Sequence, residues 1–270
     1  MNLFDFNIHL PYLKHEDVNK VIDQDLSLTN AGLLEGLRHH TTHIRKAKGV
    51  NFLLFNTNLL EEDISSFQTE ANQQFDYATY TFLVDFRRKD IAEYLEKVHA
   101  VGGKAIMVNS YLQRIAATEF DDVIRMCKIA EELELLICVD GSYGTSKMYT
   151  YDNLKLACRV SDYIFKSPII IVHAGGLRVM EALLLALEKK NVWLDTSFSL
   201  PYYLGATIEQ DFAFMMQKLN YERVVFGTDH PYIPFSDAFT AHISFFVKYN
   251  CSVEHQEKVC YKNALEVFQL

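Results

Sequence analysis

The sequence predicts an α/β fold, a (β/α)8 TIM barrel that forms one domain of residues 1–270. Three observations support this prediction. Eight short runs rich in β-branched and aromatic residues recur along the chain, helix-like segments separate most of them, and no linker or change of composition divides the sequence. Strands that are nearly continuous in apolar residues are typical of parallel sheets covered on both faces, and regular alternation of strands with helices favours a closed barrel.

The predicted strands share their short length and apolar character. They cover residues 2–10, 50–57, 79–86, 104–110, 133–140, 168–174, 191–198 and 223–229. An open doubly wound sheet is the alternative, but it usually has fewer strands and a glycine-rich first turn. The sequence contains neither GxGxxG nor GxxxxGK[ST], so it carries no signal for dinucleotide or P-loop binding.

The predicted helices show apolar residues at a spacing of about 3.6. The segment 90–103 ends in Gly102 and Gly103, where a helix C-cap favours glycine. The other helical segments are 119–134, 151–164, 178–190, 209–220, 236–249 and 253–268. Two longer connections, 11–30 and 141–150, follow predicted strands, and we expect them to cover the substrate site.

Composition excludes several classes of partner. The net charge is −9 and no basic stripe is present, so we expect no nucleic-acid partner. No apolar run approaches 18 residues, so we expect no membrane span. Five scattered cysteines without a CxxC pair, together with no signal-peptide pattern, predict a cytoplasmic protein with reduced thiols. A small-molecule substrate is the expected partner, and homo-oligomerisation stays open.

Polar side chains gather at the carboxyl ends of the predicted strands, which converge on one mouth of a barrel. They are Asn7, His9, Asn56, Asp85, Asn109, Asp140, His173, Asp195, Ser197 and Asp229. Two histidines and several carboxylates supply nitrogen and oxygen donors that suit Zn²⁺, Mn²⁺ or Fe²⁺. A single histidine at a strand end is usually structural, so the prediction rests on the whole set of polar residues at the strand ends.

Five segments resemble successive motifs of the amidohydrolase superfamily, in its amidohydrolase-2 branch of metal-dependent hydrolases and decarboxylases. They are "FDFNIHLP" (4–11), "IIIVHAGG" (169–176), "VWLDTSF" (192–198), "VVFGTDHPY" (224–232) and "KNALEVF" (262–268). The resemblance implies a (β/α)8 barrel in which a divalent metal activates water. It also implies that the aspartate of the eighth strand, here Asp229, is both a metal ligand and the general base.

Single residues of this sequence can be matched to the residues of the family's motifs, and three positions differ from the usual pattern. His9 matches the second histidine of the HxH pair on the first strand, and His173 matches the histidine of the sixth. Asn7 stands where the first histidine of HxH is usual, and Asp140 stands where a histidine of the fifth strand is common. Asn109 ends the fourth strand, where binuclear members carry a lysine, so the resemblance implies one metal ion rather than two.

The resulting prediction is one divalent ion (Zn²⁺, Mn²⁺ or Mg²⁺) held by His9, His173 and Asp229, with Asp140 and Asn7 as further candidate ligands. Asp229 and His173 are the predicted catalytic residues. Loss of the metal stays open, because an asparagine amide is a weaker ligand than an imidazole.

Further residues are candidate substrate contacts by their position. They are Asn109, Tyr143, Asp195 and His230. Asp195 is also a candidate for orienting a metal-binding histidine or the water through a hydrogen bond. The run "RHHTTHIRKAK" (38–48) places His39 and His43 on one helical face, and we interpret it as a solvated helix rather than a metal site.

The sequence therefore predicts a metal-dependent hydrolase that cleaves an amide, ester or lactone of a small polar or carboxylated substrate with activated water. The alternatives are a nonoxidative decarboxylase, a metal-independent lactonase of the same superfamily, and a ligand-binding protein without catalysis. In the lactonase alternative, Asp229 is the base on water while His9 and His173 polarise the carbonyl.

Overall fold

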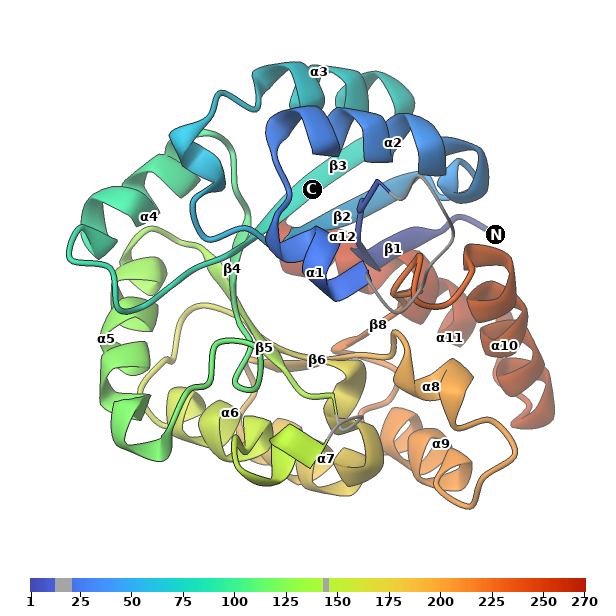
Figure 1. Cartoon of the computed structure of the whole chain (residues 1–270). Helices are drawn as coiled ribbons and strands as arrows, with labels where there is room; N and C mark the ends of the chain where they lie inside the picture. The colour runs from blue at the N-terminus through green and yellow to red at the C-terminus, as the bar shows by residue number, and fades with distance from the viewer. Residues whose placement is uncertain (13–20, 143–145) are drawn as a thin grey trace.

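The computed structural model describes residues 1–12, 21–142 and 146–270. All eight predicted strands are present, and they form one parallel sheet in chain order. The strands are β1 (Phe4–Ile8), β2 (Gly49–Leu54), β3 (Tyr77–Leu83), β4 (Ala105–Val108), β5 (Leu136–Asp140), β6 (Ile169–Val172), β7 (Val192–Asp195) and β8 (Val224–Val225). The predicted barrel is thus confirmed, with helices in a ring around the strands (Figure 1).

Backbone hydrogen bonds between β1 and the segment after β8 nearly close the barrel. Phe6 N donates to Phe226 O at 2.9 Å, and Asp229 N donates to Asn7 O at 2.8 Å. His9 N donates to His230 O, also at 2.8 Å. Because β8 is only two residues long, the backbone of the loop that follows it holds Asp229 beside the end of β1.

Helices fill most of the connections, including every segment that the sequence predicted to be an amphipathic helix. They are α1 (Val21–Leu26), α2 (Asn30–Ile44), α3 (Ser65–Gln74), α4 (Ile91–Ala100), α5 (Phe120–Glu132), α6 (Asn153–Ser161), α7 (Val179–Glu188), α8 (Ser199–Tyr202), α9 (Glu209–Lys218), α10 (Phe235–Lys248), α11 (Val253–Glu257) and α12 (Asn263–Phe268). The single helix predicted over 253–268 contains a π-helical segment, Lys258–Lys262, between α11 and α12. No helix in the described ranges is long and apolar enough to cross a membrane.

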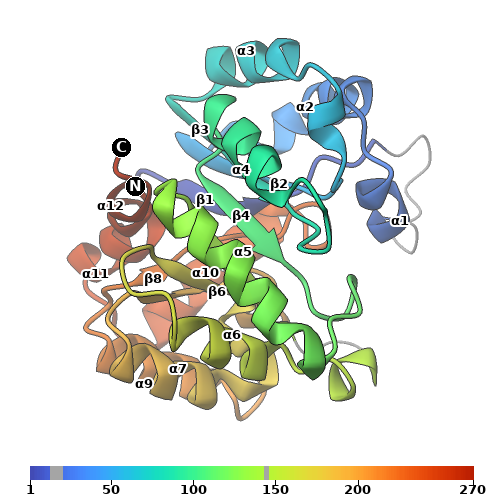
Figure 2. The same cartoon turned by 90° about the vertical axis from the view of Figure 1, so that its left-hand side faces the viewer.

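Two apolar layers hold the barrel together. One lies between the strands and the surrounding helices, and the other lies inside the barrel. At the amino-terminal end of the strands, Phe268 of α12 stacks on Phe4 and Phe6, with ring centroids 5.7 and 5.2 Å apart. In the side view, α12 and both chain termini lie at one end of the barrel and α1 lies at the other (Figure 2). The polar strand ends therefore open at the end opposite α12.

Candidate active site

A cavity of about 230 Å³ occupies the mouth of the barrel at the carboxyl ends of the strands. Five of the predicted site residues line it, namely His9, Asn109, Asp140, His173 and Asp229. The rest of its wall is mostly apolar or aromatic, with Leu53, Phe55, Met107, Tyr111, Leu112, Met148, Phe198 and Tyr232, together with Ser142. Met148 comes from the connection after β5, which was expected to cover the substrate site.

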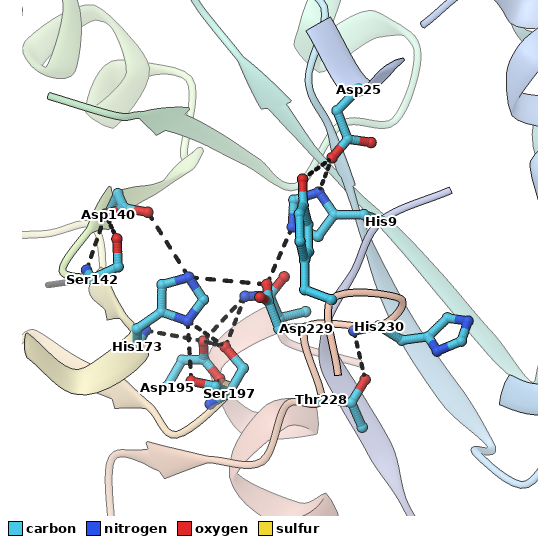
Figure 3. Close-up of polar contacts among 12 residues, drawn as sticks. His9, Asp25, Asp140, Ser142, His173, Asp195, Ser197, Thr228, Asp229 and His230 are labelled. Atoms are coloured by element: carbon cyan, nitrogen blue, oxygen red, sulfur yellow. Dashed lines mark hydrogen bonds and ion pairs between the residues drawn. The ribbon is translucent and has the colours of Figure 1, made fainter. Parts of the chain in front are cut away.

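Asp229 lies between the two histidines (Figure 3). Its Oδ1 atom is 3.3 Å from His9 Nε2 and 3.9 Å from His173 Nε2. Asp229 and His173 both have left-handed backbones, with φ of 64° and 62°. Non-glycine residues rarely adopt this conformation, and it is often found where a functional site fixes a side chain. Both residues are also buried, so the fold holds the three side chains together.

His9 is held from behind by a second carboxylate, which sequence reasoning missed. Asp25, on α1, lies with Oδ2 2.9 Å from His9 Nδ1 and accepts a hydrogen bond from the Tyr232 hydroxyl at 2.7 Å. Asp25 is fully buried. It belongs to the connection after β1 rather than to a strand end, so no local pattern in the sequence distinguishes it from a surface aspartate.

His173 is oriented by the end of β7. Its Nδ1 lies 3.0 Å from both Ser197 O and Ser197 Oγ, and its backbone N–H donates to Asp195 Oδ2 at 3.3 Å. Asn7 donates through Nδ2 to Ser197 Oγ at 2.8 Å. Gly227 is required beside this network, because a Cβ there would lie 2.6 Å from Asp195 Oδ1. Asp195 thus contacts the backbone of His173, and Asn7 contacts the serine that holds the His173 ring.

Asp140 faces His173 from β5, with Oδ2 3.9 Å from His173 Nε2. Both of its oxygens accept other hydrogen bonds. Asn109 donates to Oδ2 at 3.0 Å, while Ser142 Oγ and Asn153 Nδ2 donate to Oδ1 at 2.6 and 2.9 Å. Asn153, on α6, is a further residue that the sequence did not indicate.

The charges of this cluster shift the pKa of each member. Burial raises the pKa of Asp229, but the charge of His173 and the hydrogen bond from His9 outweigh it and hold the pKa below its usual value. Burial lowers the pKa of His9, yet the charges of Asp25 and Asp229 dominate and raise it to about 10. The pKa of His173 is also raised, because Asp229, Asp140 and Asp195 outweigh its burial. The site therefore places an ionised Asp229 carboxylate beside a protonated His9 and beside His173, whose pKa is shifted in the same direction.

Two predicted substrate contacts lie elsewhere. His230 follows Asp229 in the chain, but its ring points away from Asp229 and His9 and lines a different cavity (Figure 3). Asp195 is fully buried and does not line the cavity at the mouth. Tyr143 lies outside the described residues.

A family model for amidohydrolases matches residues 87–270, which is more than half of the sequence. The chain belongs to the amidohydrolase family. No curated protein matches it in a sequence search. The matched region includes β4 to β8 and therefore Asp140, His173 and Asp229.

Solved structures of amidohydrolase-like proteins share the fold over the full length. An amidohydrolase from Burkholderia multivorans with bound zinc is 13% identical, with a TM-score of 0.70 and complete coverage of both chains. A probable 2-pyrone-4,6-dicarboxylic acid hydrolase from Acinetobacter baumannii with bound citric acid is 17% identical, with a TM-score of 0.65 and complete coverage of both. A 5-carboxyvanillate decarboxylase from Sphingomonas paucimobilis is 13% identical, with a TM-score of 0.65 and coverage of 100% and 99%. At these identities the likeness concerns the fold.

The donor set of this amidohydrolase does not form a coordination shell in the observed arrangement. Across residues 1–12, 21–142 and 146–270, no group of three or more His, Cys, Asp or Glu is placed to hold a metal ion. Each ring nitrogen of His9 faces a carboxylate, and the Asn7 amide nitrogen is directed to Ser197. The predicted ligands His9, His173, Asp229 and Asp140 thus lie together as a cluster of acidic and basic side chains, with nitrogen–oxygen distances of 3.3 to 3.9 Å. The prediction of a bound metal stays a prediction.

Proposed function

We propose that this protein is a hydrolase that cleaves an ester, lactone or amide bond of a small molecule, with Asp229 as the general base on water. The observation that carries the proposal is the position of the Asp229 carboxylate, which lines the cavity between two imidazoles at 3.3 and 3.9 Å. A positioned base beside positioned acids is the arrangement that general acid–base catalysis requires.

The reaction follows from these positions. Asp229 takes a proton from a water molecule while the water oxygen forms a bond to the substrate carbonyl carbon. The carbonyl oxygen becomes an oxyanion, and His9 or His173 stabilises it as a charged hydrogen-bond donor. The tetrahedral intermediate then releases the leaving oxygen or nitrogen, which takes the proton back from Asp229. No oxidant or further reactant is needed.

The cavity wall supports a small substrate with an unsaturated or aromatic body. Rings of Phe55, Tyr111, Phe198 and Tyr232 line it, and no described lining residue is Arg or Lys. A substrate carboxylate, if one is present, would therefore be bound by the imidazoles of His9 and His173 rather than by a guanidinium. This limits the predicted carboxylated substrates to those that place the carboxylate close to the reacting carbonyl.

The test is hydrolysis of a panel of small aryl esters and lactones by wild-type protein and by Asp229→Asn. Loss of a general base typically lowers kcat by about 10²- to 10⁴-fold, and we expect a fall in that range. Asp85→Asn is the matched control, because Asp85 follows β3 and does not line the cavity. Equal activity of wild type and Asp229→Asn would refute the assignment of the base.

Nonoxidative decarboxylation is the second candidate, because the same fold occurs in a 5-carboxyvanillate decarboxylase. The two reactions differ in their products. Release of CO₂ from a panel of hydroxylated aromatic acids, without hydrolysis of any ester or lactone, would favour the decarboxylase. Saturable ligand binding without turnover in either panel would favour a binding protein.

A metal-assisted version of the hydrolase is tested separately. The chemistry of the donors favours zinc or manganese, and the Burkholderia multivorans structure holds zinc, but His9 would first have to exchange its contact with Asp229 for the ion. We expect activity that survives EDTA and a metal content well below one equivalent by mass spectrometry. A stoichiometric metal that is lost on His173→Ala would instead support the metal-dependent mechanism.

A further inference from the structure

The molecule contains a second cavity, larger than the first, at about 410 Å³. It lies between α2 and the loop that leads from β8 into α10. Its wall combines four histidines and one lysine with apolar residues. The lining residues are Val21, His39, His40, Thr42, His43, Lys46, His230, Pro231, Pro234, Phe235 and Ser236. Every ionisable side chain in this described lining is a base, although the protein as a whole carries a net charge of −9.

The spacing of α2 explains how three of these bases meet. His39, His43 and Lys46 follow one another by four and three residues, so they lie on one face of α2 and its carboxyl-terminal end. All three are exposed. They form the rim of the cavity, where an ammonium and two imidazoles can donate hydrogen bonds to an anionic group.

The floor of the cavity is different, because His40 and His230 are buried and hydrogen-bonded to each other. The Pro11 carbonyl only accepts, so His40 donates to it through Nε2–H at 2.9 Å. His40 Nδ1 then accepts from His230 Nε2–H at 3.0 Å. Burial is the largest cause that lowers the pKa of His40, to about 4, and that of His230, to about 3. The pair is therefore neutral at pH 7.

One buried atom of this pair is left without a partner among the described residues. The hydrogen-bond chain from Pro11 fixes the tautomer, so His230 Nδ1 carries a lone pair, and no described group donates to it. His230 itself is only 5% exposed. A buried polar atom without a partner is unusual. Because this lone pair can only accept a hydrogen bond, it would repel an anionic group, which is expected at the rim of the cavity and not at its floor.

We propose that this cavity is a second ligand site, which binds a small organic anion with its charged group at the rim formed by His39, His43 and Lys46. The apolar part of the ligand packs between Pro231, Pro234 and Phe235, above the neutral floor of His40 and His230. The size and the apolar wall favour an organic carboxylate or phosphate ester over an inorganic ion. The site is separate from the cavity at the barrel mouth, which we call the reaction cavity. Asp229 lines the reaction cavity and His230 lines the second cavity, although the two residues are adjacent in sequence.

The test uses 3-phenylpropionate as the probe and its neutral isostere, 3-phenylpropionamide, as the control ligand. The readout is the imidazole signals of His39 and His43 in NMR spectra of the full chain labelled at histidine. We expect saturable shifts with the carboxylate and no saturable shifts with the amide. Equal binding of the two ligands would overturn the assignment of an anion site.

Charge reversal at the rim provides the matched variants. Lys46→Glu replaces an attraction with a repulsion and should weaken binding of the carboxylate by about tenfold. Lys48→Glu makes the same change of net charge two residues further on, outside the cavity lining, and should change binding less than about twofold. Equal losses in both variants, or no loss in either, would contradict the proposal.

Asp229→Asn separates this site from the reaction site. The variant should retain the shifts of His39 and His43, whether or not the protein proves to be a hydrolase. Loss of those shifts in Asp229→Asn would mean that the probe binds in the reaction cavity, and the second site would be refuted.

Discussion

Each of the two cavities is lined by a buried histidine that follows a strand, His9 after β1 and His230 after β8. The side chains that contact these two histidines differ. In the reaction cavity, His9 lies between the carboxylates of Asp25 and Asp229, and its pKa rises to about 10. In the second cavity, His230 contacts His40 instead of a carboxylate, and burial lowers its pKa to about 3. Both rings are buried to a similar degree, with 3% and 5% exposed. The partner rather than the burial therefore decides the charge.

This difference separates the chemical roles of the two places. A protonated histidine beside an ionised carboxylate can stabilise developing negative charge, whereas a neutral histidine pair offers only a lone pair and an apolar surface. The backbone connects the two places closely, because His9 N donates to His230 O at 2.8 Å. Adjacent positions in one loop can thus serve a charged site and a neutral one.

The largest effect on this comparison should come from Asp25→Asn, which removes one of the two carboxylates that keep His9 protonated. Without it, Asp229 is the one remaining carboxylate beside His9 among the described residues, and the pKa of His9 should fall. Loss of such a supporting residue commonly lowers activity by about 10- to 100-fold, and we expect a fall in kcat of that size. The measurement is steady-state hydrolysis of whichever ester or lactone the wild type accepts.

Asp23→Asn is the control for Asp25→Asn, since Asp23 is an exposed residue of the same short helix. Equal kcat in Asp25→Asn and wild type would show that the contact with Asp25 does not support the reaction.

The sequence predicted the barrel and the site residues that stand at the ends of its strands. Alternating apolar strands and amphipathic helices reveal a barrel, and a barrel brings every strand end to one mouth. His9, His173, Asp140 and Asp229 could be found in this way because they stand at strand ends.

The parts that the sequence did not predict depend on contacts between distant segments. Asp25 lies on a six-residue helix, and its part in the site appears only in its contacts with His9 and Tyr232, which come from other segments. The ring of His230 turns away from the mouth, although its neighbour Asp229 points into it. Side-chain direction in an irregular loop has no periodicity, so spacing could not assign His40 and His230 to a second cavity.

A smaller effect should appear in the pH dependence of stability. It tests whether the histidines of the second cavity are neutral in the folded protein. His40 has a folded pKa of about 4, below the ordinary value of 6.5, so the unfolded chain binds more protons between these values. The free energy of unfolding therefore decreases as the pH falls from about 6.5 to about 4. In His40→Gln this slope should be shallower, while the hydrogen bond to Pro11 can be kept by the amide nitrogen.

Urea unfolding of wild type and His40→Gln between pH 4.5 and 7.5 measures the two slopes. His99→Gln, the same substitution at an exposed position in the last turn of α4, is the matched control. Identical slopes in wild type and His40→Gln would mean that His40 is not held neutral in the folded protein.

The smallest effect should come from Tyr232→Phe, which tests whether the hydrogen bond from Tyr232 to Asp25 contributes to activity. The Tyr232 hydroxyl donates to Asp25 Oδ2 at 2.7 Å, the same oxygen that faces His9 Nδ1. Phenylalanine keeps the ring in the cavity wall and removes only this hydrogen bond, whose net contribution is typically about 1 kcal/mol. A change of that size corresponds to about fivefold in rate. Because the charge of Asp25 persists, Tyr232→Phe should retain more activity than Asp25→Asn in the same assay, and the reverse order would mean that the hydroxyl contacts the substrate directly.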